Sequence, residues 1–105
     1  MLMKFVIIQS AEAYHHELER IFEEIHINSY SEMPVDGFMK NADGNSDISN
    51  WFGSSKNPYR YFISFTFLEE ERANELLGRI KEFNTETDGV SPISAYIAGI
   101  EKFVN

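Results

Sequence analysis

Cysteine is absent from the 105-residue chain. Without thiols the protein can form no disulfide framework, no thiolate metal site and no cysteine nucleophile, and the absence is compatible with a reducing compartment. No apolar run approaches the ~20 residues of a membrane-spanning helix. The segment from Met1 to Ile8 also lacks the charged region and cleavage site of a secretory signal. We therefore expect a cytoplasmic protein that is not embedded in a membrane.

Basic residues are scarce. The chain has 9 Lys and Arg against 17 Asp and Glu, which leaves a net charge of −8. Such a field repels phosphate backbones, so it disfavours nucleic-acid binding and favours cations and basic partner surfaces. Hydrophobic residues make up 43% of the chain and aromatic residues 14%, as in ordinary globular proteins. The length predicts a single domain that spans residues 1–105.

The most regular stretch runs from Tyr59 to Phe67. Its odd positions are all aromatic or aliphatic and its even positions are mostly polar, a period of two that indicates a strand with one buried face. We predict that this strand lies in the centre of a sheet. The segment before it, residues 36–58, is rich in Gly, Pro, Asn, Asp and Ser and is far longer than the ~4–6 residues of an ordinary connection. We predict that it is a long loop.

The remaining pattern predicts two helices and three further strands. A helical stripe, with Ser10 placed to cap it, follows the first strand, and a second stripe follows Glu69–Glu71. Pro34 predicts that the second strand lies at an edge or carries a bulge, because proline cannot donate to the ladder. The predicted strands cover residues 3–9, 30–35, 59–67 and 93–100, and the helices cover residues 11–25 and 69–83.

The order of these elements is β-α-β-β-α-β. It predicts an α+β, ferredoxin-like fold with a four-stranded antiparallel sheet, two helices on one face and a long loop between the second and third strands. Two helices cover only one face, yet neighbouring residues such as Phe5 and Val6 are apolar on both. We therefore expect the open face to be buried by self-association, the alternative being that the long loop folds back over it.

Three short motifs resemble those of the P-II nitrogen-regulatory signal proteins. Ser31-Glu32 and Gly37-Phe38 are similar to the residues with which that family enters its T-loop. Asp88-Gly89 falls where the family has its nucleotide-binding B-loop. The closing segment from Ala95 to Lys102 is similar to the family's last strand.

The resemblance implies a cytoplasmic homotrimer that transduces a signal by docking its T-loops onto a transporter or regulator. It also implies that a small effector binds at the clefts between subunits, near Gly37, Phe38, Lys40, Asp88 and Gly89. Residues 85–92, however, contain two acids and no base. Because acids repel phosphates, we do not expect ordinary ATP binding, and the sequence identifies no cofactor.

Several large side chains in and after the long loop are candidates for partner docking. Trp51, Phe52 and Tyr59 are aromatic, and Lys56 lies between them in the chain. Large aromatics in a polar loop commonly act as interface anchors. The alternative is that they hold the loop against its own sheet.

The first predicted helix carries a polar stripe. At 100° per residue His15, Glu19, Glu23 and His26 fall on one side of it, together with Glu12. Imidazole and carboxylate groups at this spacing are able to chelate a divalent cation, so these four residues are the candidate metal ligands. The alternative is a solvated acidic face, with His26 interacting favourably with the helix dipole.

Two other functions remain open. Trp51-Phe52-Gly53 loosely resembles the aromatic-rich hairpin of the CutA proteins, which implies a trimer that binds divalent metals. Ferredoxin-like chains also include dimeric, cofactor-free oxygenases and isomerases, which would require a polar pocket beneath the helices. No Ser-His-Asp or phosphate-loop pattern is present, so we expect no catalytic residues and no enzymatic activity.

Overall fold

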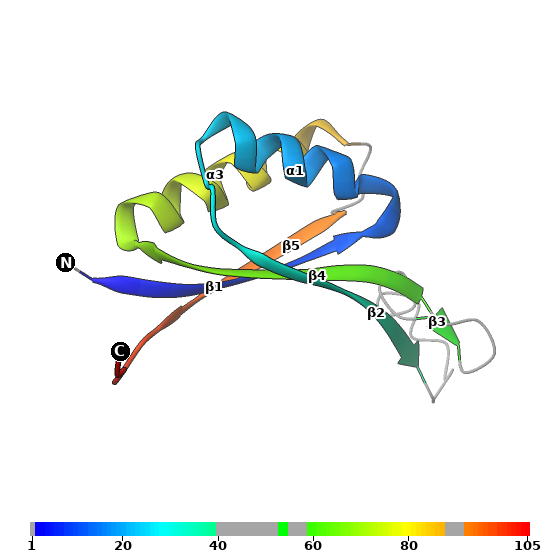
Figure 1. Cartoon of the computed structure of the whole chain (residues 1–105). Helices are drawn as coiled ribbons and strands as arrows, with labels where there is room; N and C mark the ends of the chain where they lie inside the picture. The colour runs from blue at the N-terminus through cyan, green and yellow to red at the C-terminus, as the bar shows by residue number, and fades with distance from the viewer. Residues whose placement is uncertain (1, 40–52, 55–58, 88–91) are drawn as a thin grey trace.

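The structure is a computed structural model that describes residues 2–39, 53–54, 59–87 and 92–105. Figure 1 shows two helices packed on one face of a twisted sheet. The elements are, in chain order, β1 (Met3–Ala11), η1 (Glu12–Tyr14), α1 (His15–Glu24), β2 (Ser31–Met39), β3 (Gly53–Ser54), β4 (Tyr59–Glu69), α3 (Glu70–Glu86) and β5 (Ile93–Gly99).

The sheet has the strand order β3-β2-β4-β1-β5. Strands β2, β4, β1 and β5 pair antiparallel, and the two residues of β3 add a short parallel pairing at the end of β2. The ferredoxin-like fold predicted from the order of elements is confirmed. Strand β4 has a neighbour on both sides, so the prediction that this strand lies in the centre of the sheet is also confirmed.

Strand β2 differs in extent from the prediction. It pairs with β4 and runs to Met39, so it includes four residues that we assigned to the long loop. The register places Gly37 opposite Tyr59, which keeps the ladder intact past the predicted end. Pro34 is opposite Phe62 and its other side faces the sheet edge, as a proline without a ladder donor requires.

The first helical segment begins differently from the prediction. Ser10 is not a cap, because β1 continues through it and its buried Oγ has no hydrogen-bond partner. A 3-10 turn, η1, follows, and α1 begins only at His15. The predicted apolar stripe is nevertheless correct, since Leu18, Ile21 and Phe22 are buried.

The second helix, α3, carries Glu70 and Glu71 in its first turn, as predicted. It extends to Glu86, beyond the predicted end. Arg72 of α3 donates hydrogen bonds to the carbonyl oxygens of Ile25 and His26, just after α1, so it caps the end of the neighbouring helix. No helix in the described part of the chain is long and apolar enough to cross a membrane.

The core lies between the helices and one face of the sheet. Its apolar side chains come from both helices, the segment after α1, β1 and β5, and each is almost fully covered, which contributes roughly 1.5–3 kcal/mol for a large side chain. The members of this core are Val6, Ile8, Leu18, Ile21, Phe22, Ile25, Ile27, Ala73, Leu76, Ile80 and Ile93.

The face of β4 that the helices cover is not the aromatic one. Beneath the helices β4 presents Ser64 and Thr66, which are buried opposite Ile8 and Val6 of β1. We expected the odd-numbered aromatic face of β4 to be the buried one, but Phe67 is 54% exposed. The alternation along β4 predicts one polar and one aromatic face. The direction of the crossover connections decides which of these two faces the helices cover.

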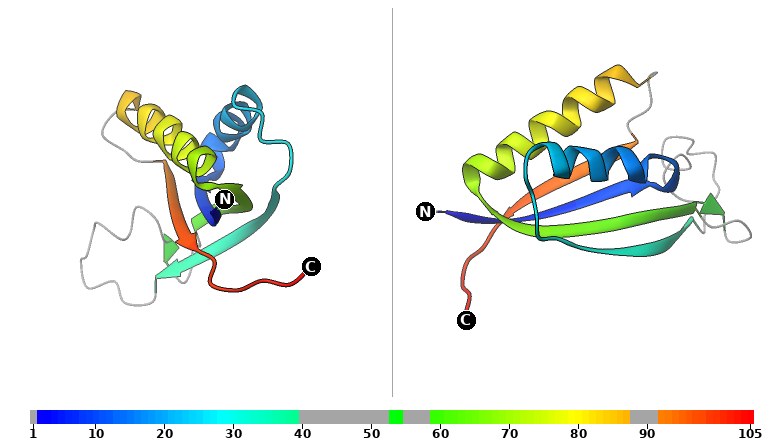
Figure 2. Two further views of the ribbon diagram at one scale, coloured as in Figure 1. Left: turned by 90° about the vertical axis from the view of Figure 1, so that its left-hand side faces the viewer. Right: turned by 45° about the horizontal axis from the view of Figure 1, so that its top comes forward.

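The opposite face is therefore apolar and lies away from the helices (Figure 2). The ring of Phe5 packs between those of Phe65 and Phe67, at centroid distances of 5.8 and 5.1 Å. Tyr96 of β5 is 54% exposed and Met33 of β2 is 46% exposed. We call this surface the bare face and define it by these five residues.

Candidate functional site

His15 is the first residue of α1 and is held in place by stacking. Its ring lies parallel to that of Phe62 on β4, with the centroids 4.0 Å apart and the planes 17° apart. The side chain of His15 is only 14% exposed. Because the 3-10 turn brings the chain from β1 back over the sheet, the imidazole is directed over β4 rather than into solvent. The ring therefore has one defined orientation.

Two carboxylates lie against the Nε2 atom of this imidazole. Glu19, one helical turn along α1, places its Oε1 atom 3.9 Å away. Glu32 reaches it from β2, at 3.4 Å. The register explains this contact, because Glu32 pairs with the buried Ser64 and so lies on the helix-covered side of the sheet. The ligand atoms of all three residues lie within 4.8 Å of one another. We call them the His15 cluster.

The His15 cluster concentrates negative charge. Burial is the main cause that raises the pKa of Tyr30, and the carboxylates of Glu32 and Glu19 raise it further. Within the described residues the ion-pair partners of these two carboxylates are the histidines His15 and His16. Elsewhere the acids pair with arginine, as Glu24 does with Arg79. In the described part of the chain, the cluster therefore has carboxylates without a permanent cation.

Only half of the metal ligands predicted from the sequence come together here. His15 and Glu19 belong to the cluster, whereas Glu23 and His26 do not. The helix ends at Glu24, and His26 adopts the left-handed conformation with φ of 59°, so it leaves the helical stripe. Sequence reasoning missed Glu32 as a ligand. Glu32 lies between Ser31 and Met33 in a predicted strand, which shows that it lies on one face of the sheet. Only the register of β2 on β4 shows that this is the face that the helices cover.

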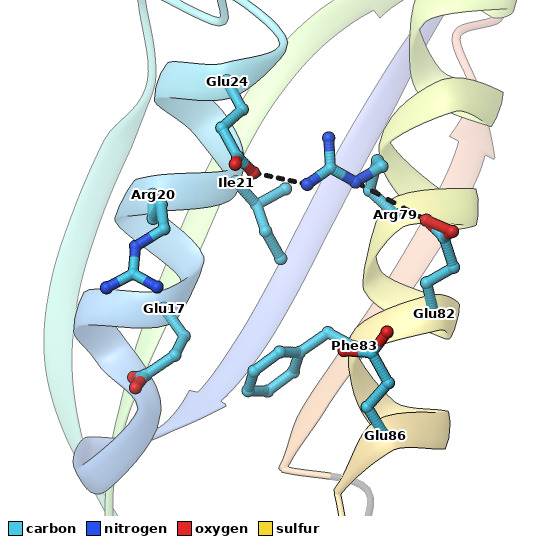
Figure 3. Close-up of a pocket in the computed structure, with 8 residues that line it drawn as sticks. All are labelled: Glu17, Arg20, Ile21, Glu24, Arg79, Glu82, Phe83 and Glu86. Atoms are coloured by element: carbon cyan, nitrogen blue, oxygen red, sulfur yellow. Dashed lines mark hydrogen bonds and ion pairs between the residues drawn. The ribbon is translucent and has the colours of Figure 1, made fainter.

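The structure also contains a cavity of about 560 Å³ between α1 and α3 (Figure 3). Arg79 forms ion pairs with Glu24 and Glu82 across its rim. The short contact to Glu24 is the main cause that raises the pKa of Arg79. Phe83 contributes an apolar wall and packs edge-on against Tyr14. The eight lining residues are Glu17, Arg20, Ile21, Glu24, Arg79, Glu82, Phe83 and Glu86.

The predicted effector residues are only partly described. Gly37 is buried and Phe38 is 52% exposed, and both lie in β2 rather than in a loop. Lys40, Asp88 and Gly89 lie outside the described residues.

The predicted docking residues are likewise mostly beyond the described part of the chain. Trp51, Phe52 and Lys56 lie outside it. Tyr59 begins β4, and only its backbone is described. The roles of these residues therefore stay predictions.

Comparison with solved structures finds the same fold in P-II-like and CutA proteins. The nitrogen regulatory P-II-like protein CPII from Thiomonas intermedia K12, in its apo form, has a TM-score of 0.63 and 14% identity, covering 95% of this chain and 90% of that one. A protein assigned to P-II-like signalling in Thermus thermophilus has a TM-score of 0.60 and 18% identity, covering 95% and 91%.

Another similar structure is that of the periplasmic divalent cation tolerance protein CutA from Archaeoglobus fulgidus. It has a TM-score of 0.60 and 11% identity, covering 98% of this chain and 88% of that one. No protein-family model matches the sequence, and no curated protein matches it. The likeness therefore concerns the fold, over nearly the whole length of each chain.

Proposed function

We propose that this protein is a P-II-like regulatory protein, a homotrimer that senses an effector and docks onto a protein partner through residues 37–58. In this proposal it acts in the cytoplasm and catalyses no reaction. The observation that carries it is the bare face, together with the fold that the chain shares with P-II-like proteins. The partner would be a transporter or another regulator.

The bare face supports the assembly. Its aromatic rings come from three adjacent strands, β4, β1 and β5, and Phe67 and Tyr96 are more than half exposed. Phe5 packs against the rings of both Phe65 and Phe67. Contiguous apolar surface of this kind on a soluble chain usually marks an interaction site. A closed symmetric assembly would bury the same surface on every copy, which is the simplest way to remove it from water.

The effector is better matched to a cation than to a nucleotide. CPII has also been solved bound to ADP, AMP and bicarbonate. In this chain residues 85–92 include Glu86 and Asp88 and contain no base, so they offer no charge to a phosphate. The net charge of −8 likewise favours cations.

A second candidate function follows from the His15 cluster. A CutA-like trimer that binds divalent metals would share the fold and the assembly. Its function would be to bind the metal rather than to dock onto a protein partner. The observation that favours it is the approach of two carboxylates to one imidazole nitrogen. The two functions differ in whether residues 37–58 bind a partner.

Light scattering on the purified chain tests the assembly. We expect a mass of three chains at micromolar protein concentration. A mass of one chain would contradict both candidate functions, and a mass of two chains would favour the dimeric oxygenase class.

A docking test distinguishes the two candidates. We expect the double variant Trp51→Ser, Phe52→Ser to fold and assemble normally but to lose the partner that the native chain retains in a cross-linked pull-down. The matched control replaces Asn74, an exposed residue of α3, with Ser. Equal capture by the native chain and the double variant would contradict docking through this segment.

A further inference from the structure

We propose that His15, Glu19 and Glu32 bind one divalent transition-metal ion of the zinc class and thereby tie α1 to β2. The binding claim stands on the geometry of the His15 cluster alone. The claim that this ion is the effector rests on the proposed function.

The distances in the cluster suit metal coordination. Zinc bonds of about 2.0–2.2 Å in a tetrahedral site place neighbouring ligand atoms about 3.3–3.5 Å apart. The Nε2 atom of His15 and the Oε1 atom of Glu32 are 3.4 Å apart, and Glu19 lies 3.9 Å from the same nitrogen. Both separations exceed the usual N–H···O hydrogen-bond distance of about 2.7–3.2 Å. The three ligand atoms thus lie within 4.8 Å of one another, close enough for one ion to bind all three after small side-chain movements.

The chemistry of the donors selects the class of metal. One imidazole nitrogen and two carboxylate oxygens suit zinc and its neighbours in the first transition row, whereas magnesium and calcium prefer sites made of oxygen alone. The stack on Phe62 fixes the plane of the imidazole, so little conformational freedom is lost when a metal binds. Glu19 and Glu32 remain 42% and 32% exposed, so an ion can enter and a water molecule can complete its coordination.

The charges of the His15 cluster also favour a bound cation. Two carboxylates face one histidine, and the further ion-pair partner of Glu19 in the described residues is His16, which is almost fully exposed. A divalent cation would neutralise this excess of negative charge, which otherwise only solvent screens around the two half-exposed carboxylates. It would compete with His16 for Glu19, and the exposed His16 side chain is free to move away.

The position of Glu32 gives the ion a structural consequence. Strand β2 lies toward one edge of the sheet and runs on to Met39, so its last residues belong to the segment 37–58 that we propose for docking. A metal ion bound by both Glu32 and His15 would attach this strand to α1, the element that precedes it in the chain. We expect metal to slow hydrogen exchange of the β2 amides.

The test is calorimetric titration of the full chain with zinc chloride, with magnesium chloride as the comparison. We expect saturable binding of one zinc ion per chain and no heat of binding with magnesium. Glu32→Gln keeps the shape of the side chain and should weaken zinc binding at least about tenfold. His15→Phe keeps a ring to stack on Phe62 and should have the same effect.

The matched control is Glu23→Gln, which removes a carboxylate from the same helix but outside the cluster. We expect it to bind zinc as the native chain does, and far-ultraviolet circular dichroism checks that each variant folds. Absence of zinc binding by the native chain would overturn the proposal, and so would equal loss in the Glu23 and Glu32 variants. A trimer that binds no zinc would refute this site only, whereas a monomer that binds zinc would refute the proposed function only.

Discussion

Burial of the bare face in a trimer predicts that one residue, Phe67, contributes strongly to assembly. Its ring is 54% exposed and lies 5.1 Å from that of Phe5. A phenylalanine buries about 200 Å², so assembly would remove about 110 Å² of this side chain from water. At about 25 cal/mol per Å² this contributes about 2.7 kcal/mol for each copy as an upper value. Three copies would contribute about 8 kcal/mol to a trimer.

The informative substitution is Phe67→Glu. It removes the apolar contribution and also places a carboxylate in the interface, where its desolvation costs further free energy. The loss of about 2.7 kcal/mol alone corresponds to about a hundredfold per copy. We therefore expect the variant to be a folded monomer at micromolar concentration, measured by size-exclusion chromatography with light scattering.

The control for added charge is Asn74→Glu, on the exposed side of α3. It changes the net charge by the same amount and should leave the assembly intact. Retention of the native mass by Phe67→Glu would refute the reasoning, because the bare face could not then be the interface. Dissociation of both variants would mean that net charge, rather than this surface, controls assembly.

Three further predictions concern polar groups that are buried or partly buried. Thr66 donates a hydrogen bond of 2.7 Å to the carbonyl oxygen of Ser29, so Thr66→Val should cost about 1–2 kcal/mol and lower the melting temperature by several degrees at fixed protomer concentration. Ser64 is equally buried but its Oγ has no partner, so Ser64→Ala should leave the melting temperature unchanged or raise it, and a clear decrease would contradict this account. Because the pKa of Tyr30 is raised from 10.0, the neutral phenol stabilises the fold below about pH 10 and that contribution is lost as the pH rises through the raised pKa. Absorbance titration should show the pKa of Tyr30 partly lowered in Glu32→Gln, since burial, the larger cause, remains, and an unchanged value would place Glu32 too far from the phenol to act on it.

Much of the fold could be predicted because its signals are local. The apolar stripe that includes Leu18 and Phe22 indicated a helix, and the alternation in β4 indicated a strand, whatever the rest of the chain does. The errors lie at boundaries and ends. The pattern predicts a cap at Ser10, although β1 continues through it. It also predicts that β2 ends at residue 35, although the ladder with β4 runs to Gly37 and the pairing with β3 carries the strand to Met39. The ends of these strands depend on the strands with which they pair, and the sequence of a single segment does not specify its partners.

The candidate site was predictable only in part. Helical spacing correctly placed His15 and Glu19 together, because one turn of α1 is all that separates them. The same spacing failed for His26, where the backbone leaves the helix with a positive φ. It could not include Glu32, which is distant in sequence and comes close only through the register of β2 on β4.

The sequence by itself determined the elements, their order and the presence of apolar residues on both sides of the sheet, since each depends on the spacing of neighbouring side chains. Tertiary structure alone decided that the helices cover Ser64 and Thr66 and leave Phe67 outside, and that a carboxylate of β2 meets an imidazole of α1. The physical reason is that periodicity defines two faces but not their surroundings. Those are set by the direction of the crossovers and by strand register.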